Sequence, residues 1–139
     1  MRHSRYTKRQ LIEVVLNNIP DKINYTLGGR IGVEDLYTKW FYTGRNEGYR
    51  LTEIGDQAFR LAEIEFYEIP VGNIEFGHYE FLLELNKKIR CPFYLSVKRS
   101  TVLNRDVYNI HPIIRIYDSE VAMMIGLYGS LLDYLNRGK

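Results

Sequence analysis

The sequence predicts an α+β fold, in which helices and short strands share one chain. Two observations lead to this prediction. Apolar residues recur at helical spacing, first over residues 11–19, whereas residues 93–97 and 112–117 alternate or run apolar as strands do. The 139 residues suffice for one domain or two very small ones, and the content of 45% hydrophobic and 26% charged residues is that of a globular protein.

The first predicted helix begins after Thr7. Thr7 and Gln10 have the spacing of a capping box, in which each side chain binds the backbone N–H of the other residue. The apolar periodicity continues to Ile19, and Pro20 ends it.

The next segment has mixed signals. We predict a strand, a glycine turn, a helix and a second turn at residues 23–27, 28–29, 33–42 and 44–48. Residues 49–51 then form a short strand that leads directly into a helix capped by Thr52. The expected apolar stripe of this helix contains Ile54, Ala58 and Leu61.

Residues 69–73 combine Pro and Gly where the periodicity breaks, so they are the best candidate for a boundary. The chain divides there into parts 1–69 and 74–139, which could share one core. The second part reads as αββα, with a helix over 78–89, strands at 93–97 and 112–117, and a final helix through Asn136. Residues 100–109 are expected to be a polar connection, and Asp118 or Ser119 to cap the last helix.

The final helix is apolar around most of its circumference, since Asp133 is the only charged residue between Val121 and Leu135. Gly126 and Gly129 interrupt it, and glycines there suggest that a backbone or a bulky ring approaches closely. A core helix packed on a sheet explains this pattern, and a self-association face is the alternative.

No catalytic, metal or cofactor motif is visible. Cys91 is the single cysteine, the three histidines have no ligand spacing, and the glycine-rich residues 28–32 lack the ending of a phosphate-binding loop. A nucleophilic pair of Cys91 with His111 is conceivable, but a cysteine before proline is more often buried. We therefore expect no enzyme and no cofactor. The lack of a possible internal disulfide, of a secretion signal and of a membrane-spanning segment favours a cytoplasmic location.

Residues 48–55, Gly-Tyr-Arg-Leu-Thr-Glu-Ile-Gly, resemble the step from strand to helix that closes many winged-helix domains. The resemblance covers roughly residues 7–66 and implies a winged-helix-like first part. The turn at 44–48 would be the wing, with Arg45 and Arg50 gripping phosphates. The helix over 33–42 would then be the recognition helix, with Lys39 and Trp40 facing the groove.

The charge distribution also bears on nucleic acid. The formal net charge of +2 is uneven: residues 1–30 carry +4, residues 31–70 carry −4 and residues 71–139 carry +2. Arg2, Arg5, Lys8 and Arg9 form a basic start that is either a solvated tail or a phosphate-contacting arm. Aromatic residues near the basic residues of the first half would suit stacking on single-stranded DNA or RNA: Tyr6, Tyr25, Tyr37, Trp40, Tyr42 and Tyr49. Residues 91–99, with Tyr94, Lys98 and Arg99, are a second candidate for that role, and an edge strand protected by charges is the alternative.

The residues of the strand after Cys91 and of the start of the last helix loosely resemble small proteins encoded by bacteriophages, over residues 91–135. This implies an accessory protein in a bacterial cytoplasm. The leading expectation is a non-enzymatic nucleic-acid-binding or regulatory protein. The alternative is a protein-interaction module, an inhibitor or an assembly subunit, that uses its aromatic surface and apolar last helix.

Overall fold

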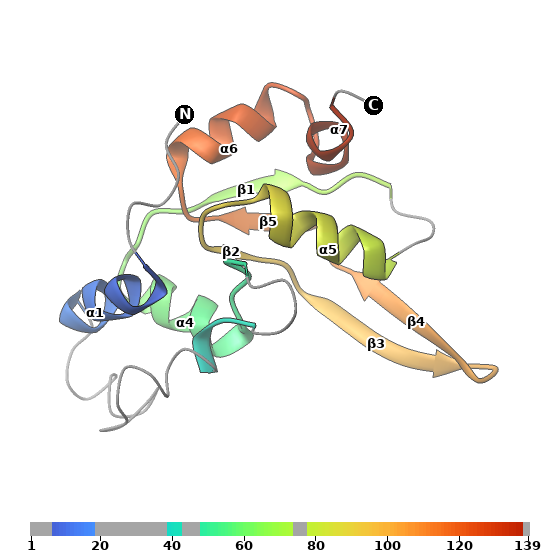
Figure 1. The fold of residues 1–139 in the computed structure, drawn as a ribbon, viewed down its shortest axis with the longest axis horizontal. Helices are drawn as coiled ribbons and strands as arrows, with labels where there is room; N and C mark the ends of the chain where they lie inside the picture. The colour runs from blue at the N-terminus through green and yellow to red at the C-terminus, as the bar shows by residue number, and fades with distance from the viewer. Residues whose placement is uncertain (1–6, 19–38, 43–47, 74–77, 138–139) are drawn as a thin grey trace.

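A computed structural model describes residues 7–18, 39–42, 48–73 and 78–137 (Figure 1). It confirms a mixed helical and stranded fold. The helices are α1 Lys8–Asn18, α4 Glu53–Leu61, α5 His78–Lys88, α6 Ser119–Gly126 and α7 Leu131–Leu135. The strands are β1 Tyr67–Pro70, β2 Phe93–Tyr94, β3 Val97–Val102, β4 Arg105–Ile110 and β5 Ile113–Ile116.

A small antiparallel sheet in the order β1-β5-β2 organises the molecule. β5 is its central strand, with Ile69 of β1 opposite Ile114 and Phe93 of β2 opposite Ile116. Residues 49–51 continue the sheet beside β2, because Leu51 N donates to the Phe93 carbonyl and Phe93 N to the Tyr49 carbonyl. β1 was not predicted. The boundary expected at 69–73 therefore falls at the end of a paired strand, and β1 pairs with a strand from beyond it.

Side-chain alternation gives the sheet two different faces. Ile69 of β1, Ile114 and Ile116 of β5 and Phe93 of β2 point into the sheet core, which α5, α6 and α7 complete. Its buried members are Ile69, Val71, Phe81, Leu85, Ile89, Cys91, Phe93, Leu95, Ile114, Ile116, Val121, Ala122, Ile125, Leu131, Tyr134 and Leu135. The opposite face carries the cross-strand row of Glu68, Arg115 and Tyr94.

A second group of apolar side chains lies between α1, α4 and the segments around Trp40 and Leu51. We call it the α1–α4 core, and its buried members are Ile12, Val15, Trp40, Phe41, Leu51, Ala58, Phe59, Ala62 and Tyr117. In Figure 1 α1 and α4 lie below the sheet and α6 and α7 above it. Tyr117, directly after β5, belongs to the α1–α4 core, so the end of the central strand is shared between both sides.

The predicted start of α1 is confirmed. Thr7 N donates to Gln10 Oε1 at 2.8 Å and Gln10 N donates to Thr7 Oγ1 at 3.2 Å, which is the reciprocal pair of a capping box. Ile12 and Val15, one turn apart, are buried in the α1–α4 core. α1 ends at Asn18, and the strand and glycine turn predicted at 23–29 lie outside the described residues.

Thr52 caps α4 as predicted, since its hydroxyl accepts from Gly55 N at 3.1 Å and donates to the Lys39 carbonyl. Gly55 is required by packing, because a Cβ there would lie 2.2 Å from the Trp40 carbonyl oxygen. The predicted apolar stripe is wrong in two positions: Ile54 and Leu61 are exposed, whereas Gly55 and Asp56 are buried.

Residues 40–42 and 50–52 run antiparallel on either side of the turn predicted at 44–48. Phe41 bridges Leu51, and Tyr42 N donates to the Arg50 carbonyl at 2.9 Å. Lys39 and Trp40 are helical, but most of the helix predicted over 33–42, and residues 43–47 of the turn, lie outside the described residues.

The polar connection predicted over residues 100–109 is wrong. β3 and β4 form a two-stranded hairpin paired from Val97 opposite Ile110 to Val102 opposite Arg105. Leu103 and Asn104 make the turn, with positive φ angles of 51° and 64°. In Figure 1 this hairpin extends away from the rest of the protein. The signal that could have predicted it is two six-residue runs that contain β-branched residues and are separated by two residues, of which Asn104 suits a turn.

The single final helix predicted through Asn136 is also wrong. Asp118 caps α6 as predicted, accepting from Glu120 N and Val121 N, but α6 ends at Gly126 and α7 restarts after Ser130, which caps it. Gly129 has φ +89°, so it serves the turn between the helices. No close approach occurs within the described chain: a Cβ on Gly126 meets nothing within 4 Å, and one on Gly129 meets only Asp133 Oδ2 at 4.0 Å.

Candidate functional site

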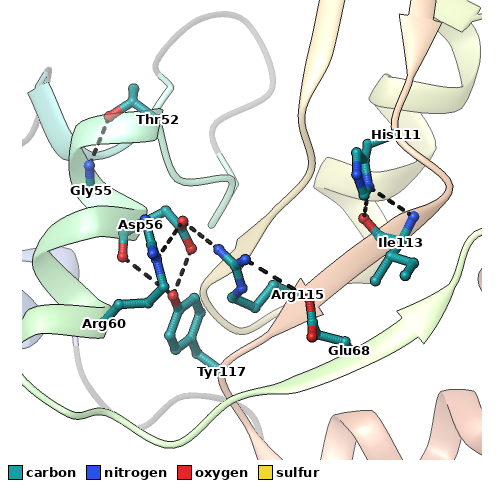
Figure 2. A network of polar contacts seen from close by, with 9 residues as sticks. All are labelled: Thr52, Gly55, Asp56, Arg60, Glu68, His111, Ile113, Arg115 and Tyr117. Carbon is teal, nitrogen blue, oxygen red and sulfur yellow. Dashed lines mark hydrogen bonds and ion pairs between the residues drawn. The ribbon is translucent and has the colours of Figure 1, made fainter.

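Asp56 of α4 is the centre of a polar network that joins α4 to Arg115 of β5 and to Tyr117 (Figure 2). Its side chain is 2% exposed. Asp56 Oδ2 accepts from Arg115 Nη1 at 2.5 Å and from Arg60 Nε at 3.1 Å, and Asp56 Oδ1 accepts from the Tyr117 hydroxyl at 2.6 Å. Two guanidinium groups and a phenol thus satisfy a carboxylate that would otherwise be costly to bury.

The pKa shifts in this network follow from burial and from the Asp56 charge. Burial raises the pKa of Tyr117, and its hydrogen bond to Asp56 raises that pKa further. For Arg115, burial lowers the pKa, but the hydrogen bond and charge of Asp56 outweigh it and the pKa rises. The hydrogen bonds that Asp56 accepts from Arg115 and Tyr117 therefore form a structural link between α4 and the end of β5.

A shallow pocket of about 180 Å³ opens beside Arg115. Its lining residues are Glu68, Tyr94, Ser96, His111, Ile113 and Arg115. It is smaller than the usual small-molecule site of about 300–1,000 Å³. The Arg115 guanidinium already faces Asp56 and, at 3.9 Å, Glu68, so its charge is balanced and the pocket does not favour an anion.

The conceivable nucleophilic pair of Cys91 and His111 has no support. Cys91 is fully buried, and burial raises the pKa of its thiol, which keeps it protonated. His111 is exposed, and its Nδ1 accepts from Ile113 N at 3.2 Å. In the part of the chain that the structure describes, no group of three His, Cys, Asp or Glu side chains could hold a metal ion.

Of the residues predicted to contact nucleic acid, those that the structure describes do not form one exposed surface. Arg2, Arg5 and Arg45 lie outside the described residues. Arg9 is exposed and 3.7 Å from Glu13, whereas Lys8 is partly buried with its Nζ 5.4 Å from the centre of the Phe41 ring. Lys39, two residues before Phe41, is exposed, so Lys8 and Lys39 both lie near Phe41, and Arg9 follows Lys8 on α1.

Trp40 and Arg50 are the predicted contacts that the structure corrects. Trp40 is 0% exposed and contacts the Phe59 ring edge-on, so it is a core residue and does not face a groove. Arg50 is partly buried: its guanidinium lies 4.1 Å from the centre of the Tyr42 ring, and its Nη2 donates to the Leu95 carbonyl at 3.4 Å. Burial lowers the pKa of Arg50. Neither side chain is presented freely to a phosphate.

The β3–β4 hairpin presents a group of accessible cations. None of its residues is fully buried, and Lys98, Arg99 and Arg105 are exposed. The hairpin contains one acid, Asp106, so its net charge is +2. Register places Lys98 and Arg105 on one side of the ribbon, because Arg105 pairs with Val102, four residues from Lys98 on the same strand. Lys98 and Arg99 were among the candidates from sequence, but Arg105 was missed.

The surface around the end of α6 is apolar. Met123 and Leu127, one helical turn apart, are 68% and 82% exposed, and Tyr128 next to them is 45% exposed. No helix in residues 7–18, 39–42, 48–73 and 78–137 is long and apolar enough to cross a membrane.

No protein-family model, no curated protein and no solved structure matches it.

Proposed function

We propose that the protein binds nucleic acid through the β3–β4 hairpin. The observation that carries the proposal is a paired two-stranded ribbon that extends from the body and exposes Lys98, Arg99 and Arg105 beside a single acid. A two-stranded β-ribbon is one of the elements that fit a groove of duplex DNA. Six residues of extended strand span about 20 Å, which matches roughly six base pairs.

The cations of the hairpin support phosphate contacts. Among the described residues none of the ion pairs involves Lys98, Arg99 or Arg105, so their charges are available to a polyanion. Tyr108 lies opposite Arg99 on the second side of the ribbon. The proposed interface is therefore the protruding hairpin and not the predicted recognition helix. Arg9 and Lys39 are the alternative basic residues that the test has to distinguish from it.

The test compares two double variants, each of which removes two exposed cations. Lys98→Gln with Arg105→Gln neutralises one side of the ribbon, and Arg9→Gln with Lys39→Gln neutralises the competing region. Affinity for duplex DNA is measured by fluorescence anisotropy over a salt series. We expect the hairpin variant to weaken binding and to reduce the slope of log K against log salt by about 1.8, since each lost phosphate contact removes about 0.9.

The second variant and Lys87→Gln on α5 are the controls, and both should bind like the unmodified protein. If the Arg9 and Lys39 pair causes the larger loss, the interface lies near α1 and the proposal for the hairpin is wrong. If the unmodified protein binds neither duplex nor single strands at low salt, nucleic-acid binding itself is wrong.

A second candidate function is self-association through the end of α6. The exposure of Met123, Leu127 and Tyr128 favours it, because large apolar side chains anchor interfaces between protein chains. Gly126 lies between these side chains and is itself exposed, so a second copy could approach the helix there.

A further inference from the structure

The turn of the hairpin carries a residue that local folding does not explain. Leu103 has φ +51° and is 90% exposed. Both central residues of this two-residue turn need positive φ, where Asn and Gly are favoured and a large aliphatic residue is rare. Asn104, with φ +64°, follows that preference and Leu103 does not. The chain therefore places a bulky apolar side chain where the backbone disfavours it and where it buries almost no surface.

The surroundings of Leu103 combine apolar surface with positive charge. Val102, directly before the turn, is 53% exposed and pairs with Arg105. Lys98 lies further along the same side of the ribbon. An apolar tip alone would suit a protein partner equally well. The cations beside the tip, with a single acid among them, favour a partner that has anionic groups on its surface and an apolar interior. A DNA duplex has both, in its phosphates and its stacked bases.

We infer that Leu103 is a wedge that inserts between two base pairs of duplex DNA while the hairpin lies along the minor groove. The inference rests on the proposed nucleic-acid function and names duplex DNA as its ligand class. Apolar side chains, leucine among them, that enter the minor groove part the base stack there and kink the helix toward the major groove. The phosphates on the groove walls would meet Lys98 and Arg105. Duplex RNA has a wide, shallow minor groove, so it offers no comparable fit.

The experiment uses a DNA duplex of about 30 base pairs with a central, easily unstacked TA step. The adenine of that step is replaced by 2-aminopurine, whose fluorescence rises on unstacking, and dyes at both ends report bending by energy transfer. The full chain should raise both signals. Leu103→Asn introduces a residue that favours the positive φ of the turn, so the hairpin stays folded while the apolar wedge is removed. It should lose both signals and bind about tenfold more weakly.

Two further variants make the result specific. Leu103→Met keeps an apolar wedge and should retain both signals. Lys98→Gln with Arg105→Gln should lower the salt slope, whereas Leu103→Asn should leave the slope unchanged.

If Leu103→Asn still unstacks and bends the duplex, Leu103 is not a wedge, although the proposed DNA binding stands. If the unmodified chain does not bind the duplex, the proposed function fails first. If Leu103→Asn instead halves the mass seen by light scattering, the tip contacts a second copy and the inference is wrong.

Discussion

Asp56 determines how α4 is attached to the sheet. Its contact with Arg60 is an i,i+4 pair within one helix, and such a pair can be read from sequence. Its contacts with Arg115 and Tyr117 join residues 59 and 61 positions apart, and no local pattern marks them. Removing one partner of a buried ion pair costs more than the pair contributes, because the other charge is left without compensation. This network is therefore sensitive to substitution at any member.

Tyr117→Phe tests the network through its pH dependence. At neutral pH the lost hydrogen bond to a carboxylate should lower the free energy of unfolding by about 1.5–3 kcal/mol. The folded pKa of Tyr117 is raised, whereas in the unfolded chain it ionises near 10.0. The stability gained by holding Tyr117 neutral is thus fully present below pH 10.0 and is lost as the pH rises above it.

The measurement is urea unfolding of both proteins at neutral pH and at a series of values above pH 10.0. The difference in free energy between the unmodified protein and Tyr117→Phe should shrink as the pH rises, since only the unmodified protein is destabilised by Tyr117 ionisation. The other tyrosines are common to both proteins and cancel. A difference that stays constant through this range would show that Tyr117 is not held neutral by the fold.

Elements whose signals are local could be predicted, and those that depend on distant packing could not. Thr7, Thr52 and Asp118 cap their helices as predicted, because a cap is a contact over three residues. The prediction of a close contact at Gly129 was wrong. A glycine in an apolar helical pattern can mark a close contact or a turn, and the φ of +89° shows that Gly129 belongs to a turn. The burial of Trp40, and so the loss of a predicted contact residue, follows from Phe59 and the rest of the α1–α4 core.

The end of α6 gives a prediction about oligomeric state. If Met123 and Leu127 form a contact with a second copy, light scattering should give about twice the monomer mass of 16.5 kDa. Leu127→Glu should then return the protein to a monomer, because a charge in the apolar contact is costly. Since Leu127 is 82% exposed in the single chain, the thermal stability of that chain should change little. Met123→Glu should also return the protein to a monomer. Leu82→Glu on α5 cannot serve as a control, because Leu82 packs against the sheet core.

A monomeric mass for the unmodified protein at high concentration would remove this candidate. If Leu103→Asn dissociates the dimer and Leu127→Glu does not, the two copies contact each other at the hairpin tip and not at α6.

At the scale of the whole molecule, two apolar cores are joined by one sheet. β1 and the segment at 49–51 lie on opposite sides of β5 and β2, and Tyr49 packs against both cores. Tyr117 extends β5 into the α1–α4 core. Neither part of the chain on its own contains the whole sheet. We therefore expect both cores to unfold in one cooperative transition.

Two native reporters test this expectation. Trp40, the single tryptophan, lies in the α1–α4 core, and Cys91, the single cysteine, lies in the sheet core. Tryptophan fluorescence and the labelling of Cys91 by a thiol reagent should show the same midpoint in urea. The buried Cys91 thiol should resist labelling in the folded protein. Midpoints that differ would show that the α1–α4 core and the sheet core unfold separately.

The pairing of β1 with β5 has a consequence for the order in which the protein can fold during synthesis. Tyr67 of β1 lies opposite Ile116, so the central strand reaches β1 only after the residues up to Ile116 have been made. The α1–α4 core waits equally long for Tyr117. While the ribosome extends the chain, Asp56 has neither Arg115 nor Tyr117 to bind. Contacts so distant in sequence slow folding, so the growing chain depends on the late emergence of β5 to close both cores together.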